Sequence, residues 1–344
     1  MTEQEMLQWE NMEKHLMQLE ERLVQCEQVN SVLLRANQQI LDYAKGLERD
    51  MNLWSRNIKY EMLDERNLWE IYFPKIRSAE EAVEEIVKGK KSLVRFGDGE
   101  FAAMMGQTRA KFHTQTDEGM ALRLKEVLQN QREDVVTAIA DNYGNLDAYT
   151  VSSQREIRAY MSPEVREFHS KVLLPGKIYY NAYLSRPYAM YADKGTSGPA
   201  ERFQSLRKLW EGKKCVFIEG EKTRMGVGND LFSNAGSIQR ILAPAVNAFR
   251  VYDWLLAEAE KCSKEVVFLL ALGPTATVLA YDLAVRGYQA LDIGHLDLEY
   301  EWYLLGAEGR ARVPHKYNNE YPDGELVEDI EDALYEQQII ARCV

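Results

Sequence analysis

The strongest constraint in this 344-residue chain is a seven-residue repeat that runs through its first 54 residues. Apolar side chains recur at the two seam positions of the repeat, a and d, and no proline interrupts them. The a positions are Trp9, Leu16, Leu23, Asn30, Asn37, Ala44 and Met51, and the d positions are Met12, Leu19, Cys26, Leu33, Ile40, Leu47 and Trp54. The repeat predicts a helical coiled coil over residues 1–56, roughly 70 Å long at about 1.5 Å rise per residue.

Polar residues in and beside this seam indicate how copies of the helix would pair. Asn30 and Asn37 occupy consecutive a positions, where their amides can bond each other in a parallel, in-register pair. Arg22 at a g position would face Glu27 at an e position of the neighbouring chain. Apolar side chains outside the seam widen the face and leave a trimer open, namely Val29, Leu34, Leu41 and Tyr43. We therefore expect a homo-oligomer through residues 9–54, with a parallel dimer favoured over a single helix folded back on its own domain.

The composition argues against a nucleic-acid-binding, a disulfide-rich or a membrane-spanning protein. The formal net charge is -12, which argues against duplex nucleic acid or an anionic membrane as the main partner. The four cysteines are scattered, without a CxxC pair, so neither a disulfide framework nor a zinc site is expected. The N-terminus lacks a signal-peptide pattern, and no apolar run approaches the ~20 residues that span a bilayer. A cytoplasmic location without a transmembrane segment is the expectation.

The rest of the chain divides by pattern. Residues 57–77 read as a connector, and Ser78 with Glu81 forms a capping box that opens the first helix of a domain over residues 78–320. Residues 321–344 read as an acidic helix, because apolar residues recur along one line of an acidic segment.

Within the domain, short apolar runs alternate with helical stretches, which is typical of an α/β fold with a mostly parallel sheet and flanking helices. Strands are predicted at 92–96, 135–140, 178–182, 215–219, 248–251, 266–272 and 290–293. Helices are predicted at 117–129, 199–210, 233–242, 253–262 and 275–286. Open sheets of this kind bind ligands at the carboxyl ends of their strands, so the loops that follow strands are the places to search for chemistry.

The first such loop carries two carboxylates, Asp98 and Glu100, on either side of Gly99. Acidic side chains at i and i+2 suit a hard divalent ion, Mg²⁺ or Mn²⁺, which often bridges carboxylates to a diphosphate. The alternative is a tight turn whose acids cap the next helix. The spacing alone favours neither.

Two further loops carry features that bind phosphate. In the loop at 219–230, Lys222 and Arg224 lie among glycines, which favours phosphate binding over the alternative of an ordinary surface loop. In the loop at 272–277, Pro274 fits a first helical turn whose free amides, at Thr275 and beyond, would attract an anion.

The last predicted strand leads into a polar segment in which His295, Asp297 and Glu299 alternate with apolar residues. Such a face can present a base, a metal ligand or a hydroxyl acceptor, whereas a lone histidine is more often structural. Arg186, between two tyrosines, is a further candidate for gripping a sugar or a phosphate.

Four blocks in this order resemble the bacterial glycosyltransferases of the GT-D fold. They are RFGDGE (95–100), GEKTRMGVGNDLF (220–232), ALGPTATVLAYDLA (271–284) and DIGHLDLEYEW (292–302). The resemblance covers roughly residues 78–320, and the coiled coil is a departure from the family pattern. It implies a Rossmann-like domain that transfers a hexose, glucose or galactose, from a UDP-sugar to a glycan acceptor in protein or cell-surface glycan assembly.

The resemblance also assigns roles. The Asp-x-Glu motif implies that Asp98 and Glu100 bind Mn²⁺ or Mg²⁺. By similarity, Glu221, Lys222, Arg224 and Asn229 would line the donor site. The strand-end loops themselves add further candidates for donor binding, Arg95, Gly97, Gly228, Thr275 and Arg186, and candidates for catalysis, His295, Asp297 and Glu221.

Two other functions remain open at this stage. A different nucleotide-cofactor enzyme, such as a methyltransferase, could use the segment at 266–293, but it would leave Asp98 and Glu100 without a task. A non-enzymatic scaffold built on the coiled coil would leave the polar loops at the strand ends unexplained.

Overall fold

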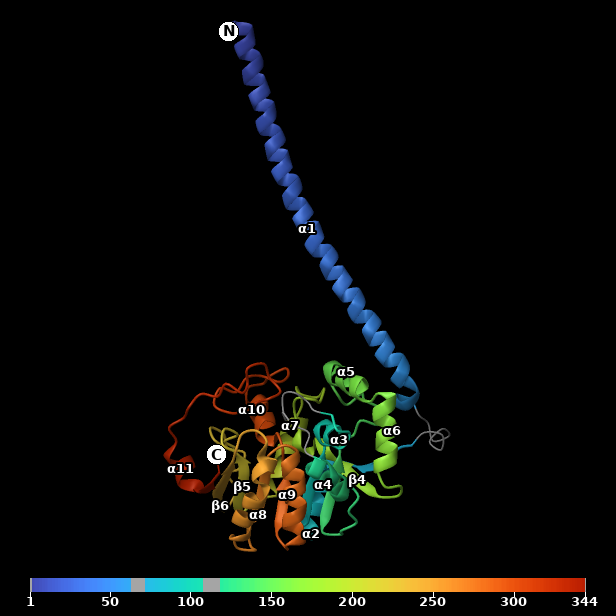
Figure 1. The fold of residues 1–344 in the computed structure, drawn as a ribbon, viewed down its shortest axis with the longest axis vertical. Coiled ribbons are helices and arrows are strands. Elements are labelled where there is room, and N and C mark those ends of the chain that lie inside the picture. Colours follow the sequence, from blue (N-terminus) through green and yellow to red (C-terminus); the bar gives the residue numbers. More distant parts are fainter. Residues whose placement is uncertain (1, 63–71, 108–117, 344) are drawn as a thin grey trace. The chain divides into compact units, whose positions relative to one another are not determined.

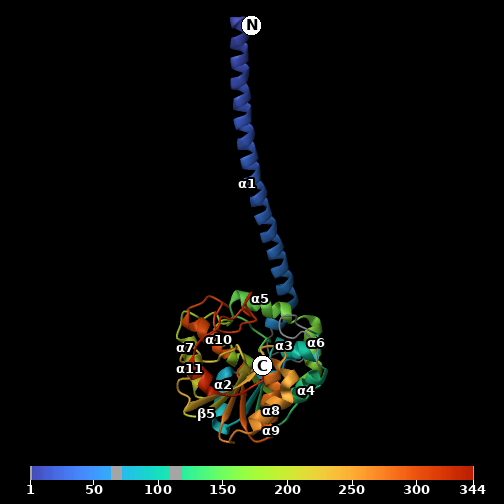
Figure 2. The ribbon, with the colours of Figure 1, turned by 60° about the vertical axis from the view of Figure 1, so that its left-hand side comes forward.

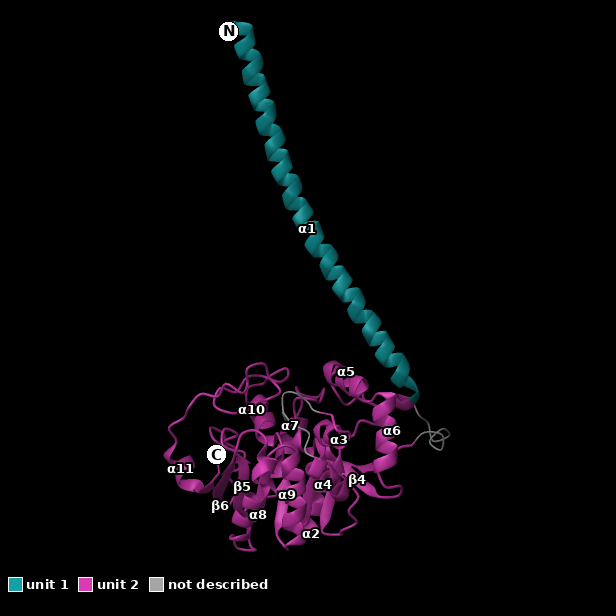
Figure 3. Cartoon of the chain, viewed as in Figure 1, with its two compact units in different colours: residues 1–59 teal, residues 60–344 magenta. Residues whose placement is uncertain are grey.

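The structure is a computed structural model that describes residues 2–62, 72–107 and 118–343. The chain forms two compact units, residues 1–59 and residues 60–344, which Figure 3 colours separately. None of the described helices combines the length and the apolar composition that a membrane span requires.

The N-terminal segment is one continuous helix, α1 (Glu3–Glu61) (Figure 1). The predicted long helix is therefore confirmed, and it includes the first five residues of the predicted connector, 57–61. No proline or glycine stands at that point to stop it. Pairing of α1 with another copy remains a prediction at this point.

The second unit is built on a single parallel sheet, which confirms the predicted fold class. Its nine described strands lie in the order β1-β4-β3-β2-β8-β7-β5-β6-β9, and every pair is parallel. The strands are β1 (Lys75–Arg77), β2 (Ser92–Phe96), β3 (Val135–Ile139), β4 (Ile178–Asn181), β5 (Lys214–Gly220), β6 (Ser237–Ala243), β7 (Val267–Ala271), β8 (Gln289–Asp292) and β9 (Ile339–Arg342).

Helices cover both faces of this sheet (Figure 1, Figure 2). They are α2 (Ala79–Gly89), α3 (Asp98–Met104), α4 (Glu118–Leu128), α5 (Val151–Tyr160), α6 (Pro163–Val172), α7 (Gly198–Arg207), α8 (Tyr252–Glu260), α9 (Pro274–Val285), α10 (Leu296–Leu304) and α11 (Ala333–Gln338), with short 3₁₀ helices η1 (Ala182–Ser185) and η2 (Ala248–Val251). Helix α2 begins at the predicted capping box, where Ser78 Oγ accepts from Glu81 N and Glu81 Oε2 accepts from Ser78 N.

Alternation along the strands divides the interior into two cores. Val94 and Phe268 point to the face that carries α4, α8 and α9, while Leu93 and Leu269 point to the face that carries α2, α7 and α10. Strands buried on both faces are nearly continuous apolar runs, which is why β2, β5 and β7 could be predicted from sequence.

The predicted helix at 233–242 is wrong, because residues 237–243 form β6. Arg240 on β6 is buried and pairs with Glu219 on the neighbouring β5. This ion pair joins residues from two neighbouring strands, so the spacing of residues within 233–242 contains no information about it. Conversely, the predicted strand at 248–251 is the 3₁₀ helix η2, which follows Asn247 in the left-handed region at φ 55°.

The predicted C-terminal helix at 321–344 is also wrong over most of its length. Only α11 is helical there, capped by Asp332, whose side chain accepts from Tyr335 N at 3.0 Å. The chain then pairs with β6 as the ninth strand. The Tyr335 ring lies 4.8 Å from the Arg240 guanidinium, so this end of the chain packs over the buried β5–β6 ion pair.

The centre of the sheet contains a topological switch point. Strands β2 and β8 are neighbours, yet α3 follows β2 onto one face while α10 follows β8 onto the other. The two connections diverge and leave a crevice beyond the strand ends, where open α/β sheets bind their ligands.

Candidate functional site

A cavity of about 660 Å³ opens at this crevice. Its walls come mainly from the segments that follow β2 to β8, from one side of α5 and from the segment after α10. A cavity of this size falls in the range that holds a cofactor or a nucleotide-sized ligand. The carboxyl-end loops predicted from sequence therefore do converge.

The floor of the pocket is an ion pair between the two central strands. Arg95 of β2 donates through Nε to the backbone oxygen of Asp292 at 2.9 Å, and through Nη2 to its Oδ1 at 2.9 Å. Thr277 Oγ1 on α9 donates to Asp292 Oδ2 at 3.1 Å. Gly294 lies against the guanidinium, where a Cβ would stand 2.0 Å from Arg95 Nη2. The predicted donor residue Arg95 is thus held in place by the next strand.

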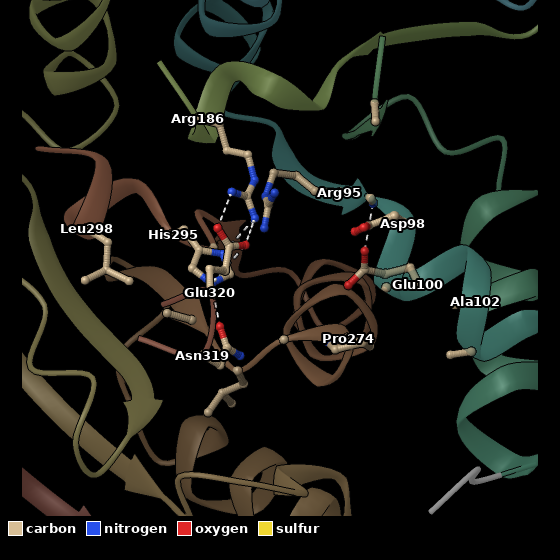
Figure 4. Close-up of a pocket in the computed structure, with 18 of the residues that line it drawn as sticks. Arg95, Asp98, Glu100, Ala102, Arg186, Pro274, His295, Leu298, Asn319 and Glu320 are labelled. Atoms are coloured by element: carbon tan, nitrogen blue, oxygen red, sulfur yellow. Dashed lines mark hydrogen bonds and ion pairs between the residues drawn. The ribbon is translucent and has the colours of Figure 1, made fainter. Parts of the chain in front are cut away.

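Asp98 and Glu100 stand together at the start of α3, on one side of the pocket (Figure 4). Glu100 Oε2 accepts from Gly97 N at 2.7 Å, so this carboxylate caps its own helix. The helix-capping interpretation is therefore confirmed for Glu100, whose carboxyl group also lines the cavity, while metal binding stays a prediction.

The charge of Glu100 is finely balanced. Loss of hydration and the nearby Asp292 carboxylate raise the pKa of Glu100 to about 7, while Arg95 opposes this rise. A proton therefore remains on this carboxyl group below about pH 7 and leaves it above that pH. An approaching cation would displace that proton.

On the opposite side, Arg186 makes a bidentate ion pair with Glu320, which includes a 2.9 Å bond from Nη1 to Oε2. Arg310 Nε lies 3.1 Å from the same carboxylate, and Arg310 also pairs with Glu156 of α5 at 2.9 Å. His295 completes the group (Figure 4). Its Nδ1 lies 3.4 Å from Arg186 Nη2.

The protonation state of His295 follows from these contacts. Loss of hydration, together with Arg186, lowers the pKa of His295. Because an arginine only donates, Nδ1 of the neutral ring accepts from Arg186, and Nε2 then carries the hydrogen toward Asn319 Oδ1 at 3.3 Å. The pocket thus holds a neutral imidazole near pH 7.

The cationic side chains of the pocket are already neutralised. Among the described residues that line it, the arginines are Arg95, Arg186 and Arg310, and each is paired with a carboxylate. No lysine belongs to this described lining. An anionic ligand therefore meets no unpaired cationic side chain among these residues, while Asp98 and Glu100 add negative charge.

Asp297 lines the pocket, but its carboxylate oxygens already accept hydrogen bonds from the surrounding loops. Its carboxylate accepts from Gly226 N at 2.8 Å, from Asn229 Nδ2 at 2.9 Å and from Lys316 Nζ at 2.6 Å. Lys316 is buried and also lies 2.7 Å from Glu301 Oε1. This cluster joins the loop after β5 and the segment after α10 to the start of α10.

The remaining predicted residues lie outside the cavity wall that the structure describes: Glu221, Lys222, Arg224, Gly228, Asn229 and Thr275. Arg224 donates instead to the backbone oxygens of His315 at 2.9 Å and Glu328 at 2.7 Å. The glycine-rich loop therefore holds the segment that carries Glu320, while Gly220, Thr223 and Met225 reach the wall.

Sequence reasoning missed Glu320, Asn319, Arg310 and Glu156, which complete the wall opposite α3. They come from α5 and from the segment after α10, where no glycine-rich motif follows a strand. The available signal was the group of basic residues at 310–316 between Glu308 and Glu320, whose partners lie partly on other elements.

A family model and two curated relatives that resemble this chain are all described as glycosyltransferases. The family described as "Glycosyltransferase GT-D fold" matches residues 93–321. Glycosyltransferase GlyD of Streptococcus pneumoniae serotype 4 (strain ATCC BAA-334 / TIGR4) is 35% identical over 268 residues, which are 78% of this chain and 32% of the relative. A probable glycosyl transferase Gly of Streptococcus gordonii is 33% identical over 77% of this chain and 38% of its own length.

Solved structures agree. A structure of the domain of unknown function 1792, described as having a distinct glycosyltransferase fold, matches with a TM-score of 0.74 and 36% identity over 78% of this chain and 95% of that one. A glycosyltransferase with the same domain from Streptococcus sanguinis matches with a TM-score of 0.74 and 32% identity, over 79% of this chain and 100% of that one.

The packing of Gly294 against Arg95 leads to a test of the pocket floor. Gly294→Ala places a Cβ in the guanidinium and also strains a backbone at φ +48°. Gly306→Ala is the matched control, because Gly306 has φ +61° with open space around it. We expect G306A to lose about 1–2 kcal/mol in urea unfolding from backbone strain alone. G294A should lose roughly 1.5–3 kcal/mol more, because the charge-assisted hydrogen bonds of Arg95 are displaced. Equal losses in the two variants would contradict the tight packing.

Proposed function

This chain belongs to the GT-D-fold glycosyltransferases, and from that membership we propose that its pocket transfers a hexose, glucose or galactose, from a UDP-sugar to a glycan acceptor. The proposal includes a divalent metal, Mn²⁺ or Mg²⁺, held by Asp98 and Glu100. The chain spans about a third of the length of the curated relatives it matches, 32% and 38%. The acceptor class, a glycan on a protein or at the cell surface, is therefore part of the proposal.

The observation that carries this proposal is the charge arrangement of the pocket. A nucleotide diphosphate brings negative charge to a wall whose described arginines are already paired with carboxylates. Two carboxylates, Asp98 and Glu100, stand at the same wall. An acidic pocket can hold a diphosphate when a divalent cation lies between the two, which is the chemistry this donor set suits.

The donor set also fits the way in which Mg²⁺ and Mn²⁺ bind nucleotides. The described residues contain no group of three histidine, cysteine or acidic side chains that could hold a metal. Mg²⁺ typically binds through one or two carboxylates together with substrate phosphates and waters. Asp98 and Glu100 supply the two carboxylates. We therefore expect tight metal binding only together with the nucleotide.

The residues of this chain then divide the work of the transfer. A bound metal would neutralise the charge that develops on the leaving diphosphate. The ion pair of Arg95 with Asp292 holds β2 against β8. This contact positions the loop after β2, which carries Asp98. His295 is the residue we assign as base, in a transfer that inverts the anomeric centre. Its neutral ring can take the proton of an acceptor hydroxyl at Nδ1, where the proton would replace the long 3.4 Å hydrogen bond from Arg186. Asp297 is assigned a positioning role, since its oxygens hold the surrounding loops.

The same reasoning reassigns the predicted donor-loop residues. Arg224 and Asn229 hydrogen-bond within the protein, and we propose that they position the wall that carries Glu320. Family membership favours this glycosyltransferase over the methyltransferase and scaffold alternatives. A glycosyltransferase also gives Asp98 and Glu100 a task that neither alternative supplies.

Substitution of the two carboxylates tests the proposal. Asp98→Asn and Glu100→Gln each remove a negative charge, and glutamine still serves in a capping box, so E100Q should keep α3 intact. We expect UDP release from UDP-glucose or UDP-galactose with Mn²⁺ to fall about 10²–10³-fold in each variant. Asp134→Asn, at an exposed acid paired with Arg132, is the control and should retain full activity. Undiminished release by D98N and E100Q would refute the metal assignment.

The raised pKa of Glu100 predicts a pH dependence of metal binding. Below pH 7 the carboxyl group is protonated, so a metal must displace one proton in order to bind. Titration calorimetry with Mn²⁺ and saturating UDP should show the affinity falling about tenfold per pH unit between pH 7 and 5. The slope should become shallower in E100Q, where only the terminal phosphate of UDP, which titrates at about pH 6, still has a proton to lose. Equal slopes in the wild type and E100Q would show that Glu100 is not a ligand.

The assignment of His295 has its own test. His295→Gln should lower kcat for UDP release about 10²–10⁴-fold while the KM for the UDP-sugar changes little. Because the pKa of His295 is lowered, the fall of wild-type kcat on acidification, measured at saturating Mn²⁺, should begin at a lower pH than an ordinary histidine would give. His315→Gln, at an exposed histidine, is the control. A kcat within about threefold of wild type would remove His295 as the base.

A further inference from the structure

Helix α1 displays an apolar stripe that its own unit does not cover. All fourteen a and d positions between Trp9 and Trp54 are exposed, with Leu16 at 54% and Ile40 at 65%. A helix in water owes most of its stability to packing of its apolar face, and soluble proteins rarely expose apolar stripes of this length. We propose that α1 pairs with α1 of a second copy of this chain, parallel and in register, over residues 9–54.

The charges that flank the seam select the parallel direction. In a parallel pair each g residue faces the e residue five positions later on its partner, which sets His15 opposite Glu20 and Arg22 opposite Glu27. In an antiparallel pair of full overlap, e positions face e positions, which sets Glu13 opposite Glu48. The antiparallel pair also sets His15 opposite Asp50, but only the parallel arrangement is free of a like-charge pair across the seam.

The amides within the seam select the register. Asn30 and Asn37 both occupy a positions and are exposed in the single helix. In an in-register parallel pair, each amide meets its own counterpart and the two can hydrogen-bond. A slip of one heptad would set Asn37 opposite Ala44 and leave a buried amide without a partner, which costs about 1–3 kcal/mol.

Apolar residues next to these amides supply the cover that two chains need. Val29 at g faces Leu34 at e of the second copy, and Ala36 faces Leu41 in the same way. These contacts flank the two asparagine layers on both sides of the seam. They extend the apolar interface at the place where its centre is polar, so two copies suffice to cover it.

Cross-linking of Cys26 can test whether the two helices are parallel and in register. Cys26 is a free, exposed cysteine at a d position, so a parallel in-register pair brings two copies of it into one layer. A disulfide needs Cβ atoms about 3.5–4.5 Å apart. In an antiparallel pair of full overlap, Cys26 would lie opposite Asn37, and the two thiols would be roughly 16 Å apart along the axis at ~1.5 Å per residue.

Oxidation of the full-length protein with copper–phenanthroline therefore tests direction and register. We expect the wild type to form a covalent dimer on a non-reducing gel and Cys26→Ser to form none. The matched variant combines Cys26→Ser with Gln28→Cys, which moves the thiol to an outward f position and should cross-link at least tenfold more slowly. Absence of the wild-type cross-link, or equal cross-linking of the moved thiol, would overturn the parallel in-register pair.

Light scattering on the same full-length chain tests the number of copies. The expected mass is twice that of the 39.7 kDa chain. Ile40→Glu, at a d position, should give a monomer, whereas Gln39→Glu, on the outward side, should remain a dimer. UDP release should persist in I40E, which separates this proposal from the proposed function. A monomeric wild type, or a trimer, would overturn the two-copy pairing.

Discussion

The ion pair between Arg95 and Asp292 holds together the point on which the site depends. It joins β2 to β8 at the topological switch point, where the chain leaves the two strands toward opposite faces of the sheet. The crevice at that point exists because the two connections diverge. Gly294 allows the guanidinium to lie against the backbone, where any side chain would displace it. The pocket floor is therefore tied directly to the two strands beneath it.

Above that floor, the pocket is organised by carboxylates that serve different purposes. Glu320 and Asp297 are engaged with cationic side chains, and each ties a loop to the wall. Glu100 accepts a hydrogen bond from Gly97 and holds its proton up to about pH 7. One group of acids therefore builds the cavity. Asp98 and Glu100 give it a negative edge, which suits a ligand that arrives with its own cation.

Much of the candidate site was predictable because its residues follow buried strands. Asp98, Glu100 and His295 each come directly after an apolar run, and parallel strands deliver their following loops to one edge. The glycine-rich loop was predicted to bind the donor because glycines and cations suggest phosphate. In the folded chain, Arg224 is instead used to hold the backbone near His315. Residue type indicates which groups a side chain can bind. It does not indicate whether that group belongs to a ligand or to another segment of the same chain.

The sequence by itself determined the long helix α1 and the parallel sheet, because both follow from the spacing of apolar residues along a short stretch of chain. Only the tertiary structure decided that 237–243 is a strand, because the buried pair of Arg240 with Glu219 links neighbouring strands. It also brought Glu320 to Arg186, two residues far apart in the sequence. Periodicity is local and can be read from neighbours in the chain, whereas a buried ion pair depends on distances that exist only after folding.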